Sequence, residues 1–373
     1  MGKIKFTDKN GSFVIENPEN YSGLYLPLAG EMGLKSNITP SMAGDAKTDQ
    51  NHFLLEPVSI ENLHNNKNGR NFWCRIEGNG IWSVSGASAL QEAEKFTASQ
   101  DESKIEAGLM WQKLTRISKK YGIKSEVLSF VPTDKNIEIM YVTLENTSAE
   151  SIKFTPVAAI PLYGRSADNI RDHRHVTSLL HRISTQEYGI EVSPVLSFDE
   201  RGHQKNSTTY FVYGSKEDGT KPETFYPTNE MFIGEGGSFL NPEAVRTVKE
   251  GVKAGAKIQG KEAVGALAFE SVELKAGEKT GYIVVAGITD DVLEIEKTTV
   301  LYRTKEAVLE CFENTKRHWV EKVNIDFEMN DDSVDNYLKW ICFQPILRRI
   351  YGCSFLPYHD YGKGGRGWRD LWQ

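Results

Sequence analysis

The last stretch of the chain, residues 355–373, concentrates groups that can bind a polar ligand. Its four glycines tolerate positive φ and let a loop fold closely around a ligand. Donors, acceptors and aromatic side chains stand among them: Arg366, Arg369, Asp370, Trp368 and Trp372. An aspartate that accepts two neighbouring hydroxyls, an arginine that donates in a planar fork and a tryptophan that covers the apolar ring face together complement a pyranose. These residue types favour a sugar-binding site.

Other interpretations of this stretch compete with sugar binding. The glycine spacing matches neither the G-x-x-x-x-G-K-[ST] phosphate loop nor a G-x-G-x-x-G turn after a strand, so phosphate binding ranks below sugar binding. On composition alone, a salt-bridged surface turn explains the residues equally well. His359 and Asp360 adjoin the loop. Because the side chains of sequence neighbours usually diverge, we expect them to hydrogen bond beside the substrate rather than to form an acid–base pair.

Two further groups of residues raise functional hypotheses that we rank low. His173, His175 and His181 suggest a metal site, but no carboxylate-rich spacing accompanies them. If residues 172–177 form a strand, His173 and His175 point to opposite sides, and we expect no metal. Early aromatic residues suggest a stacking platform for sugars, although packing in a core is the better explanation for Phe72, Trp73 and Trp82.

The elements that must position the glycine-rich stretch begin with a long series of strands. Between about residues 6 and 290, short runs of β-branched and aromatic residues alternate with turn clusters of Gly, Asn, Asp, Ser and Pro. Clear strand signals lie at residues 137–144, 209–214 and 281–287. Residues 144–154 place a polar turn between two alternating segments, as a hairpin or a sheet-crossing connection does. Asn146 begins a glycosylation sequon in that turn, and we interpret it as a turn residue.

After residue 290 the pattern becomes helical. Apolar residues near helical spacing predict a linker helix within 304–319. The polar residues 330–333 predict a helix start, followed by apolar positions from Val334 to Ile346, with Pro345 kinking or ending the helix. We therefore divide the chain into a β-sandwich domain at residues 1–300, a helical linker at 301–329 and a further helical region at 330–373.

Composition narrows the class of protein. The net charge of −7 provides no basic field for phosphate backbones, so we expect no nucleic acid partner. No run of about 18 apolar residues is present, so we expect no membrane span. The start of the sequence lacks the apolar region of a secretory signal. Four cysteines without C-x-x-C spacing disfavour zinc and disulfides. Together these features predict a cytoplasmic protein.

Several motifs resemble glycoside hydrolase family 94, formerly glycosyltransferase family 36. Residues 365–373, GRGWRDLWQ, are similar to its G-[FW]-R-D-x-x-Q-D motif. Residues 72–75 and 80–83 are similar to its early strands, and residues 232–244 are similar to its F-[IL]-G-x-G…P-x-A signature. Residues 172–177 also resemble family members, so the resemblance covers essentially the whole chain. The family contains cellobiose, cellodextrin, laminaribiose and chitobiose phosphorylases.

The resemblance implies a fold and a mechanism. Family members have an N-terminal β-sandwich, a helical linker, an (α/α)6 barrel and a small C-terminal β-domain, so residues 330–373 are expected to begin a barrel that is truncated here. Inorganic phosphate, as co-substrate, attacks the anomeric carbon of a β-linked glucose disaccharide or oligosaccharide and gives an α-sugar 1-phosphate. Only one protein acid is needed, whereas inverting hydrolysis needs two carboxylates. No cofactor and no metal are implied.

The family motif assigns roles to individual residues. Asp370 and an earlier basic residue of the glycine loop, which is an arginine in the family, are expected to bind sugar hydroxyls at subsite −1. The loop has one residue more than the cellobiose phosphorylase pattern, so Lys363 or Arg366 is the counterpart of that arginine, and the bidentate guanidinium favours Arg366. Arg369 binds substrate or holds Asp370, and the other expected substrate-binding residues of the stretch are Trp368 and Gln373.

The sequence departs from the family at Cys353, where disaccharide phosphorylases carry a phosphate-binding arginine. Arg348, Arg349, Lys363 or residues beyond the end are then left to bind phosphate. The family's general acid lies in a W-N-D motif beyond Gln373, so this chain alone is expected to be inactive. Two alternatives remain: a non-catalytic carbohydrate-binding sandwich, and an (α/α)6-barrel hydrolase or transferase. The resemblance also implies a homodimer in which the stretch at residues 172–175 lies near a partner's active site.

Overall fold

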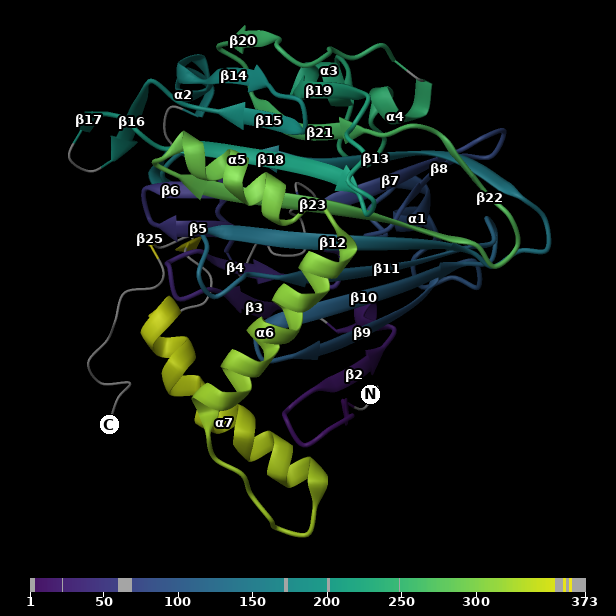
Figure 1. Cartoon of the computed structure of the whole chain (residues 1–373), viewed down its shortest axis with the longest axis vertical. Coiled ribbons are helices and arrows are strands. Elements are labelled where there is room, and N and C mark those ends of the chain that lie inside the picture. Colours follow the sequence, from purple (N-terminus) through teal and green to yellow (C-terminus); the bar gives the residue numbers. More distant parts are fainter. Residues whose placement is uncertain are drawn as a thin grey trace.

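A computed structural model describes residues 4–21, 23–59, 69–170, 174–199, 202–247, 249–352, 358–359 and 362–363. It is built mainly of antiparallel strands in layers, with helices on one outer face and at the end of the chain (Figure 1). The largest sheet contains eleven of the strands in these ranges. In spatial order they are β1 (Lys5–Phe6), β2 (Phe13–Glu16), β9 (Glu102–Gly108), β10 (Trp111–Ser118), β11 (Ile123–Phe130), β12 (Ile137–Asn146), β23 (Lys279–Thr289), β18 (Thr209–Lys216), β15 (Gly189–Val192), β14 (Arg182–Thr185) and β20 (Lys257–Gln259).

A second large sheet packs against the first and shares its core. Its strands in the described ranges are β19 (Thr224–Thr228), β21 (Ala263–Ala268), β13 (Ile152–Leu162), β7 (Asn71–Ile76) and β8 (Gly80–Ser83), with β22 (Val272–Leu274) also paired to β13. The shared core contains Phe72 and Trp82, neither of which is exposed. Trp73 is equally buried but packs on the other face of β7. These three aromatics are therefore core residues, as predicted.

Both faces of the largest sheet are covered at its centre. In β12, Met140 and Val142 face the second sheet, while Ile139 and Tyr141 join an apolar cluster beneath the helices on the outer face. A strand that is buried on two sides needs apolar residues at nearly every position. This explains why residues 137–144 read as a continuous apolar run, and why the strand predictions at 137–144, 209–214 and 281–287 are confirmed by β12, β18 and β23.

The polar turn after β12 is a sheet crossing and not a hairpin. β12 belongs to the eleven-stranded sheet and β13 to the second sheet, so the chain changes layer between Asn146 and Ile152. Asn146 is only 1% exposed, and its side-chain nitrogen donates to the carbonyls of Glu150 and Leu274 at 2.7 and 2.9 Å. The sequon asparagine therefore holds the crossing together, in agreement with its interpretation as a turn residue.

A smaller four-stranded sheet contributes to the same core, through residues such as Leu28, Ile38 and Leu54. Its strands follow one another in sequence and in space: β3 (Leu26–Ala29), β4 (Lys35–Ile38), β5 (Ala46–Asp49) and β6 (His52–Leu55). Two-stranded ribbons are formed by β16 (Leu196–Asp199) with β17 (Gly202–Lys205) and by β24 (Tyr358–His359) with β25 (Gly362–Lys363). The sequence patterns did not predict that these strands form a sheet of their own.

Three longer helices follow the strands. They are α5 (Val292–Leu301), α6 (Lys305–Val323) and α7 (Asp332–Tyr351). Figure 1 shows α5 and α6 in front of the large sheet, with α7 below them leading toward the C-terminus. Both helix predictions near residues 304–319 and 330–346 are confirmed, and Pro345 lies inside α7, which continues to Tyr351. Within the described ranges, no helix combines the length and apolar character needed to span a bilayer.

Short helices occupy the connections. They are η1 (Pro18–Asn20), α1 (Ala89–Glu94), η2 (Ala167–Ile170), α2 (Arg174–Thr177), η3 (Ser178–Leu180), α3 (Asn229–Ile233) and α4 (Glu243–Thr247). The expectation that His173 and His175 alternate along a strand was wrong for the described part of that stretch, because residues 174–177 are helical. A helix of one turn, followed directly by η3, replaces the extended conformation on which the alternation was based.

Candidate functional site

The predicted sugar-binding residues fall almost entirely outside the described part of the chain. Arg366, Trp368, Arg369, Asp370 and Gln373 lie outside it. Only the backbone of Lys363 is described, in β25, where it pairs with Tyr358. The long described element that precedes these residues in sequence is α7, which packs against strands of the N-terminal half.

The first half of α7 is fixed to the N-terminal strands. Asp331 caps the helix by accepting hydrogen bonds from the backbone of Ser333 and Val334. The Asn336 side chain accepts a hydrogen bond from the Gly11 backbone at 2.8 Å, and Trp340 Nε1 donates to the Gly11 carbonyl at 2.8 Å. The turn between β1 and β2 is thus held by two side chains one helical turn apart.

The second half of α7 is fixed to the four-stranded sheet. The buried Tyr351 hydroxyl lies 2.9 Å from the Leu28 carbonyl and 2.7 Å from the Ser36 carbonyl. Lys35 Nζ donates to the Ile350 carbonyl at 2.9 Å, satisfying one of the acceptors left free at a helix end. α7 ends at Tyr351, and the capping residue that follows, Gly352, has a φ of 77°, which favours glycine. The position of the last turn of α7 is therefore set by β3 and β4.

The two arginines of the last helical turn have different surroundings. Arg349 donates a hydrogen bond to Glu31 at 3.0 Å. The Glu31 carboxylate also forms an ion pair with Lys322 of α6 at 2.9 Å and lies 3.3 Å from the His318 ring. Partial burial acts to raise the pKa of Glu31, but the hydrogen bonds from Lys322, Arg349 and His318 outweigh it and lower the pKa to about 2. Arg348 instead interacts electrostatically with Tyr25. Of the two, Arg349 is thus held by the β3–β4 turn.

A buried ion pair links the three sheets next to this helix end. Arg70, directly before β7, donates to both carboxylate oxygens of Glu138 in β12, and Ser36 of β4 donates to Glu138 at 2.7 Å. Arg70 and Glu138 are 1% and 4% exposed. A bidentate guanidinium–carboxylate pair with further hydrogen bonds offsets the cost of removing both charges from water. This network fixes the four-stranded sheet, and with it the end of α7, to the sandwich.

Charges on β4 and β5 form a second buried group that sequence analysis did not single out. Lys35 and Lys47 stand directly opposite one another across the two strands. Burial lowers the pKa of Lys47 to about 8, although nearby Asp45 acts in the opposite direction. Burial also raises the pKa of Asp45, and one of its carboxylate oxygens has no hydrogen-bond partner within the described residues. The D-x-K-x-D pattern at residues 45–49 was the available signal, since alternate residues of a strand share a face.

This second group is covered rather than open. Asp45 is not exposed and Lys47 is 4% exposed, with the Lys47 ammonium 5.1 Å from the centroid of the Phe53 ring. In this conformation neither side chain presents a surface to a ligand. Asp45 also interacts electrostatically with Tyr351 at the end of α7.

The motif at residues 232–244 forms a corner of the sandwich. Phe232 of α3 and Ala244 of α4 lie in one apolar cluster. Gly234 has a φ of 82°, and a Cβ there would lie 2.5 Å from the Glu243 carboxylate. A glycine is therefore required at this position. The motif stabilises the fold.

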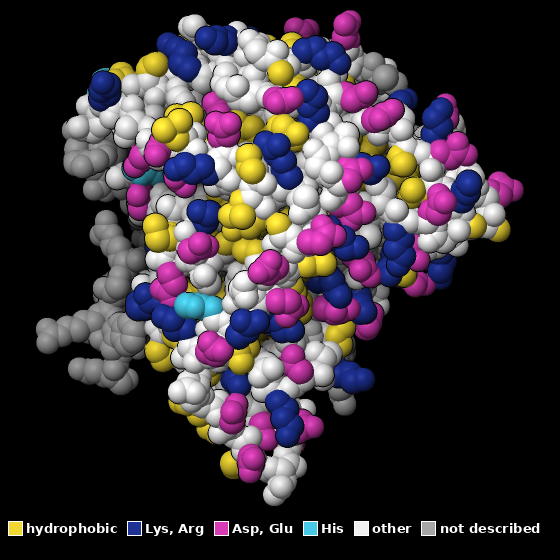
Figure 2. Space-filling model, in the orientation of Figure 1, with side chains coloured by type: hydrophobic (Ala, Val, Ile, Leu, Met, Phe, Trp, Pro, Cys, Tyr) yellow, Lys and Arg dark blue, Asp and Glu magenta, His cyan; other side chains and the backbone are white. Residues whose placement is uncertain are grey.

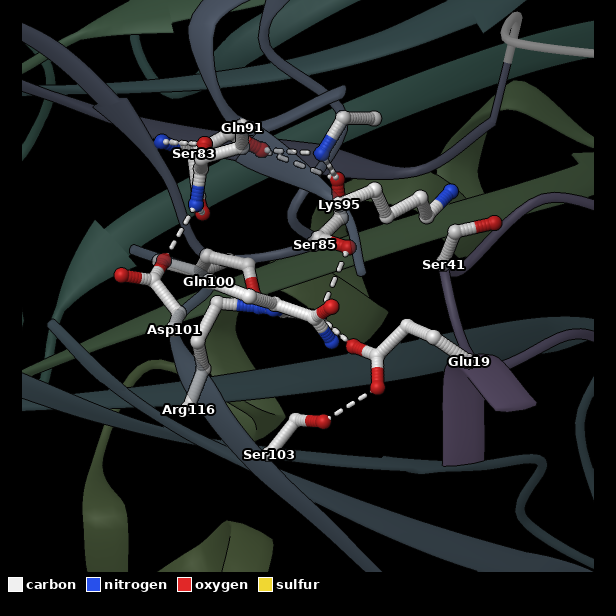
Figure 3. A network of polar contacts seen from close by, with 12 residues as sticks. Glu19, Ser41, Ser83, Ser85, Gln91, Lys95, Gln100, Asp101, Ser103 and Arg116 are labelled. Carbon is white, nitrogen blue, oxygen red and sulfur yellow. Dashed lines mark hydrogen bonds and ion pairs between the residues drawn. The ribbon is translucent and has the colours of Figure 1, made fainter. Parts of the chain in front are cut away.

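A polar network at one end of the sandwich resembles a binding site but is too small for a sugar (Figure 3). Arg116 donates to Glu19 at 2.6 Å, and Asp101 accepts from Trp82 Nε1 and Gln91 at 2.8 Å each. Glu19, Gln91, Asp101 and Arg116 line a cavity with a volume of about 20 Å³. That volume holds a water molecule and not a pyranose. The strand Gly80–Ser83, which belongs to the early family motif, therefore has a structural role at this end of the sandwich.

The stretch near residues 172–177 adjoins another buried polar group. Arg165 donates to Glu262, and its Nε lies 3.4 Å from Nε2 of His181. Burial, together with the charge of Arg165, lowers the pKa of His181 to about 3, so the imidazole is neutral at neutral pH. Among the described residues, no group of three or more His, Cys, Asp or Glu side chains lies close enough together to hold a metal ion. Asp172 and His173 lie outside the described residues.

Comparison with protein families identifies the sandwich. The family model for glycosyl hydrolase 94, supersandwich domain, matches residues 41–305. The chain belongs to this family. The match covers β5 through the start of α6 and includes the Arg70–Glu138 pair and the α3–α4 corner. A search of curated proteins gave no match.

Solved structures also match the chain, at low sequence identity. A bacterial glucoamylase complexed with acarbose is 9% identical, with a TM-score of 0.49, over 92% of this chain and 43% of that chain. A protein from the human microbiome described as a kojibiose phosphorylase is 9% identical, with a TM-score of 0.47, over 93% of this chain and 42% of that chain. The chain thus spans less than half the length of these two proteins. We draw no functional conclusion from similarities at this level.

Proposed function

We propose that this chain is the N-terminal part of an inverting glycoside phosphorylase. The observation that carries the proposal is the family 94 supersandwich match over residues 41–305, joined to the G-x-R-G-W-R-D-like stretch that follows α7. The substrate is a β-linked glucose disaccharide or oligosaccharide, and the co-substrate is inorganic phosphate. The product is an α-sugar 1-phosphate, and the working form is a cytoplasmic homodimer.

In this proposal the residues of the glycine-rich stretch bind the sugar that is transferred. Asp370 accepts hydrogen bonds from hydroxyls at subsite −1, Arg366 donates to them, and Trp368 covers the apolar ring face. Arg369 and Gln373 hold Asp370 in position or contact the substrate. Lys363 remains the alternative to Arg366. The general acid, which protonates the leaving sugar, is expected in sequence beyond Gln373.

The phosphate site is the least constrained part of the proposal. Cys353 stands where related disaccharide phosphorylases carry an arginine, so another cation must bind the anion. Arg349 pairs with Glu31 and would have to leave that contact to bind phosphate, and Arg348 and Lys363 are the other candidates in this chain. No cofactor is required, because phosphate itself is an anionic nucleophile.

The proposal is tested with the complete reading frame, expressed and incubated with β-linked glucose disaccharides. We expect sugar 1-phosphate to form only when inorganic phosphate is present. Free glucose formed without phosphate would instead indicate a hydrolase, and no reaction together with sugar binding would indicate a carbohydrate-binding module. Residues 1–373 alone are expected to give no product.

The site assignment is tested with Asp370→Ala in the complete protein. Because Asp370 binds hydroxyls that the transition state needs, we expect kcat/KM to fall by roughly 10²-fold or more, the usual scale for losing a positioned charged hydrogen bond. Glu313→Ala, which removes an exposed carboxylate of α6, serves as the matched control and should retain activity. Full activity of Asp370→Ala would rule out the assignment.

A further inference from the structure

The outer face of α5 is unusually apolar for a solvent-facing helix. Its exposed large apolar side chains are Val292, Leu293, Val300 and Leu301, with exposed fractions of 53%, 66%, 58% and 49%. On its inner face, Ile295, Thr298 and Thr299 are buried toward the sheet. The apolar residues therefore do not serve the core. In Figure 2, apolar side chains reach the surface in the region that α5 occupies in Figure 1. Such a surface is typical of a contact site.

The exposed residues of α5 are arranged symmetrically along the helix. The midpoint lies between Glu296 and Lys297, both of which are exposed. An apolar pair lies at each end of the helix, at equal distances from that midpoint: residues 292–293 and residues 300–301. Reversing the helix direction exchanges each apolar pair with the other and exchanges Glu296 with Lys297. The outer face of α5 is thus complementary to its own antiparallel copy, in both apolar character and charge.

We propose that α5 packs against α5 of a second copy of this chain, antiparallel and about a twofold axis through that midpoint. In a twofold interface the same patch meets itself, so each residue contacts its symmetry-related position. The apolar end of one helix then covers the apolar end of the other. Glu296 of each copy faces Lys297 of its partner, and Lys297, which also pairs with Glu294 at 2.6 Å within its own chain, joins both carboxylates.

The size of α5 limits what it contributes to such an interface. A ten-residue helix is about 15 Å long, and a stable dimer buries about 800 Å² on each partner. The α5 contact alone is smaller than that. We therefore propose that α5 determines how the two copies are aligned and oriented. Further buried area comes from α6, which follows α5 on the same face of the sheet (Figure 1). This assignment gives a surface to the homodimer of the proposed function and rests on that part of it.

The test is a charge exchange measured by sedimentation equilibrium of this chain at several concentrations. Glu296→Lys places like charges opposite each other across the axis, and we expect the dimer dissociation constant to rise by roughly tenfold or more. Lys297→Glu should do the same. The double variant Glu296→Lys/Lys297→Glu restores opposite charges between the copies and should return the constant to within about threefold of the wild type. Circular dichroism verifies that each variant is folded.

The control is Glu270→Lys, which makes the same change of charge at an exposed position between β21 and β22, strands of the second sheet and not of the face that α5 and α6 cover, and should leave the dissociation constant unchanged. A wild-type chain that stays monomeric at all concentrations would overturn the proposal, as would a dimer unaffected by the single exchanges. Single exchanges that weaken the dimer without rescue by the double variant would exclude the twofold register. The phosphorolysis assay does not depend on these outcomes. If the α5 interface is ruled out, the proposed reaction can still be tested. If the reaction is ruled out, the interface can still be tested.

Discussion

At the scale of single residues, the described structure places its most constrained charges around the end of α7. Arg70 and Glu138 are buried together, Glu31 collects three basic side chains, and Lys47 lies buried beside Phe53. None of these residues belongs to the family motif that predicted the sugar site. Their effect is to hold the helix that leads to that motif.

The Arg70–Glu138 pair gives a direct stability prediction. Arg70→Met leaves the Glu138 carboxylate buried without its partner, and we expect the free energy of unfolding to fall by about 3–5 kcal/mol. Urea denaturation measures the loss. Arg70→Met/Glu138→Leu removes both charges and should be less destabilising than the single change. A double variant as unstable as Arg70→Met, or a loss below about 1 kcal/mol, would mean that the pair is not a coupled unit.

Glu31 gives a prediction for the pH dependence of stability. Its pKa is lowered from 4.5 to about 2 in the folded chain. The charged form is therefore favoured by folding, and its contribution is complete above pH 4.5 and disappears as the pH falls through about 2. Glu31→Gln should destabilise the protein at neutral pH, with the difference from wild type shrinking in acid. Thermal denaturation between pH 2 and 7 measures it, and Glu313→Gln is the control. A difference independent of pH would contradict the ion-pair explanation.

At the scale of elements, the local sequence was sufficient to predict a strand or helix where burial of apolar residues or a helix cap determines the structure. Strands β12, β18 and β23 were predictable because β-branched and aromatic residues fill both of their faces, and α7 because a polar cap precedes its apolar positions. The four-stranded sheet was not predictable, since its strands have only four residues each and include Lys35 and Lys47. Their burial depends on tertiary contacts, which single-sequence patterns do not contain.

The start of α7 can be tested through its cap. Asp331 accepts two backbone hydrogen bonds at the first turn. Asp331→Ala should reduce stability by about 0.5–2 kcal/mol, as is typical for loss of an N-cap carboxylate. Hydrogen exchange of the Ser333 and Val334 amides should accelerate first. Asp332→Ala, one residue further along, keeps the cap and should have a smaller effect. Equal effects of the two changes would indicate a general charge effect at the helix end.

At the scale of the whole molecule, the fold class followed from the alternation of strands and turns together with the family resemblance, and the supersandwich match agrees with it. The candidate site was located by its glycine-rich composition and by family motifs. Its geometry lies outside the described residues, so the roles of Asp370 and Arg366 stay predictions. The Arg70–Glu138 pair and the Glu31–Lys322 pair could not be foreseen, because each joins segments more than 60 residues apart.

The shared core predicts that the two large sheets unfold together. One apolar cluster contains Phe72 and Phe154 of the second sheet as well as Val142 and Val284 of the first. Separating the sheets would expose all of these side chains, at a cost of about 1.5–3 kcal/mol each. Hydrogen exchange in increasing denaturant should therefore give the same opening free energy for central amides of β12 and β13. Two distinct opening free energies would show that the sheets are independent units.

The pairing of β12 with β23 has a consequence for synthesis on the ribosome. β23 begins at Lys279, about 130 residues after β12 ends at Asn146. At roughly 5–20 residues per second, translation needs on the order of ten seconds to deliver that partner. During this interval the apolar edge of β12 has emerged without the strand that will cover it, although β11 can already pair with its other side. The nascent chain therefore passes through a period in which chaperone binding at β12 would protect it from aggregation.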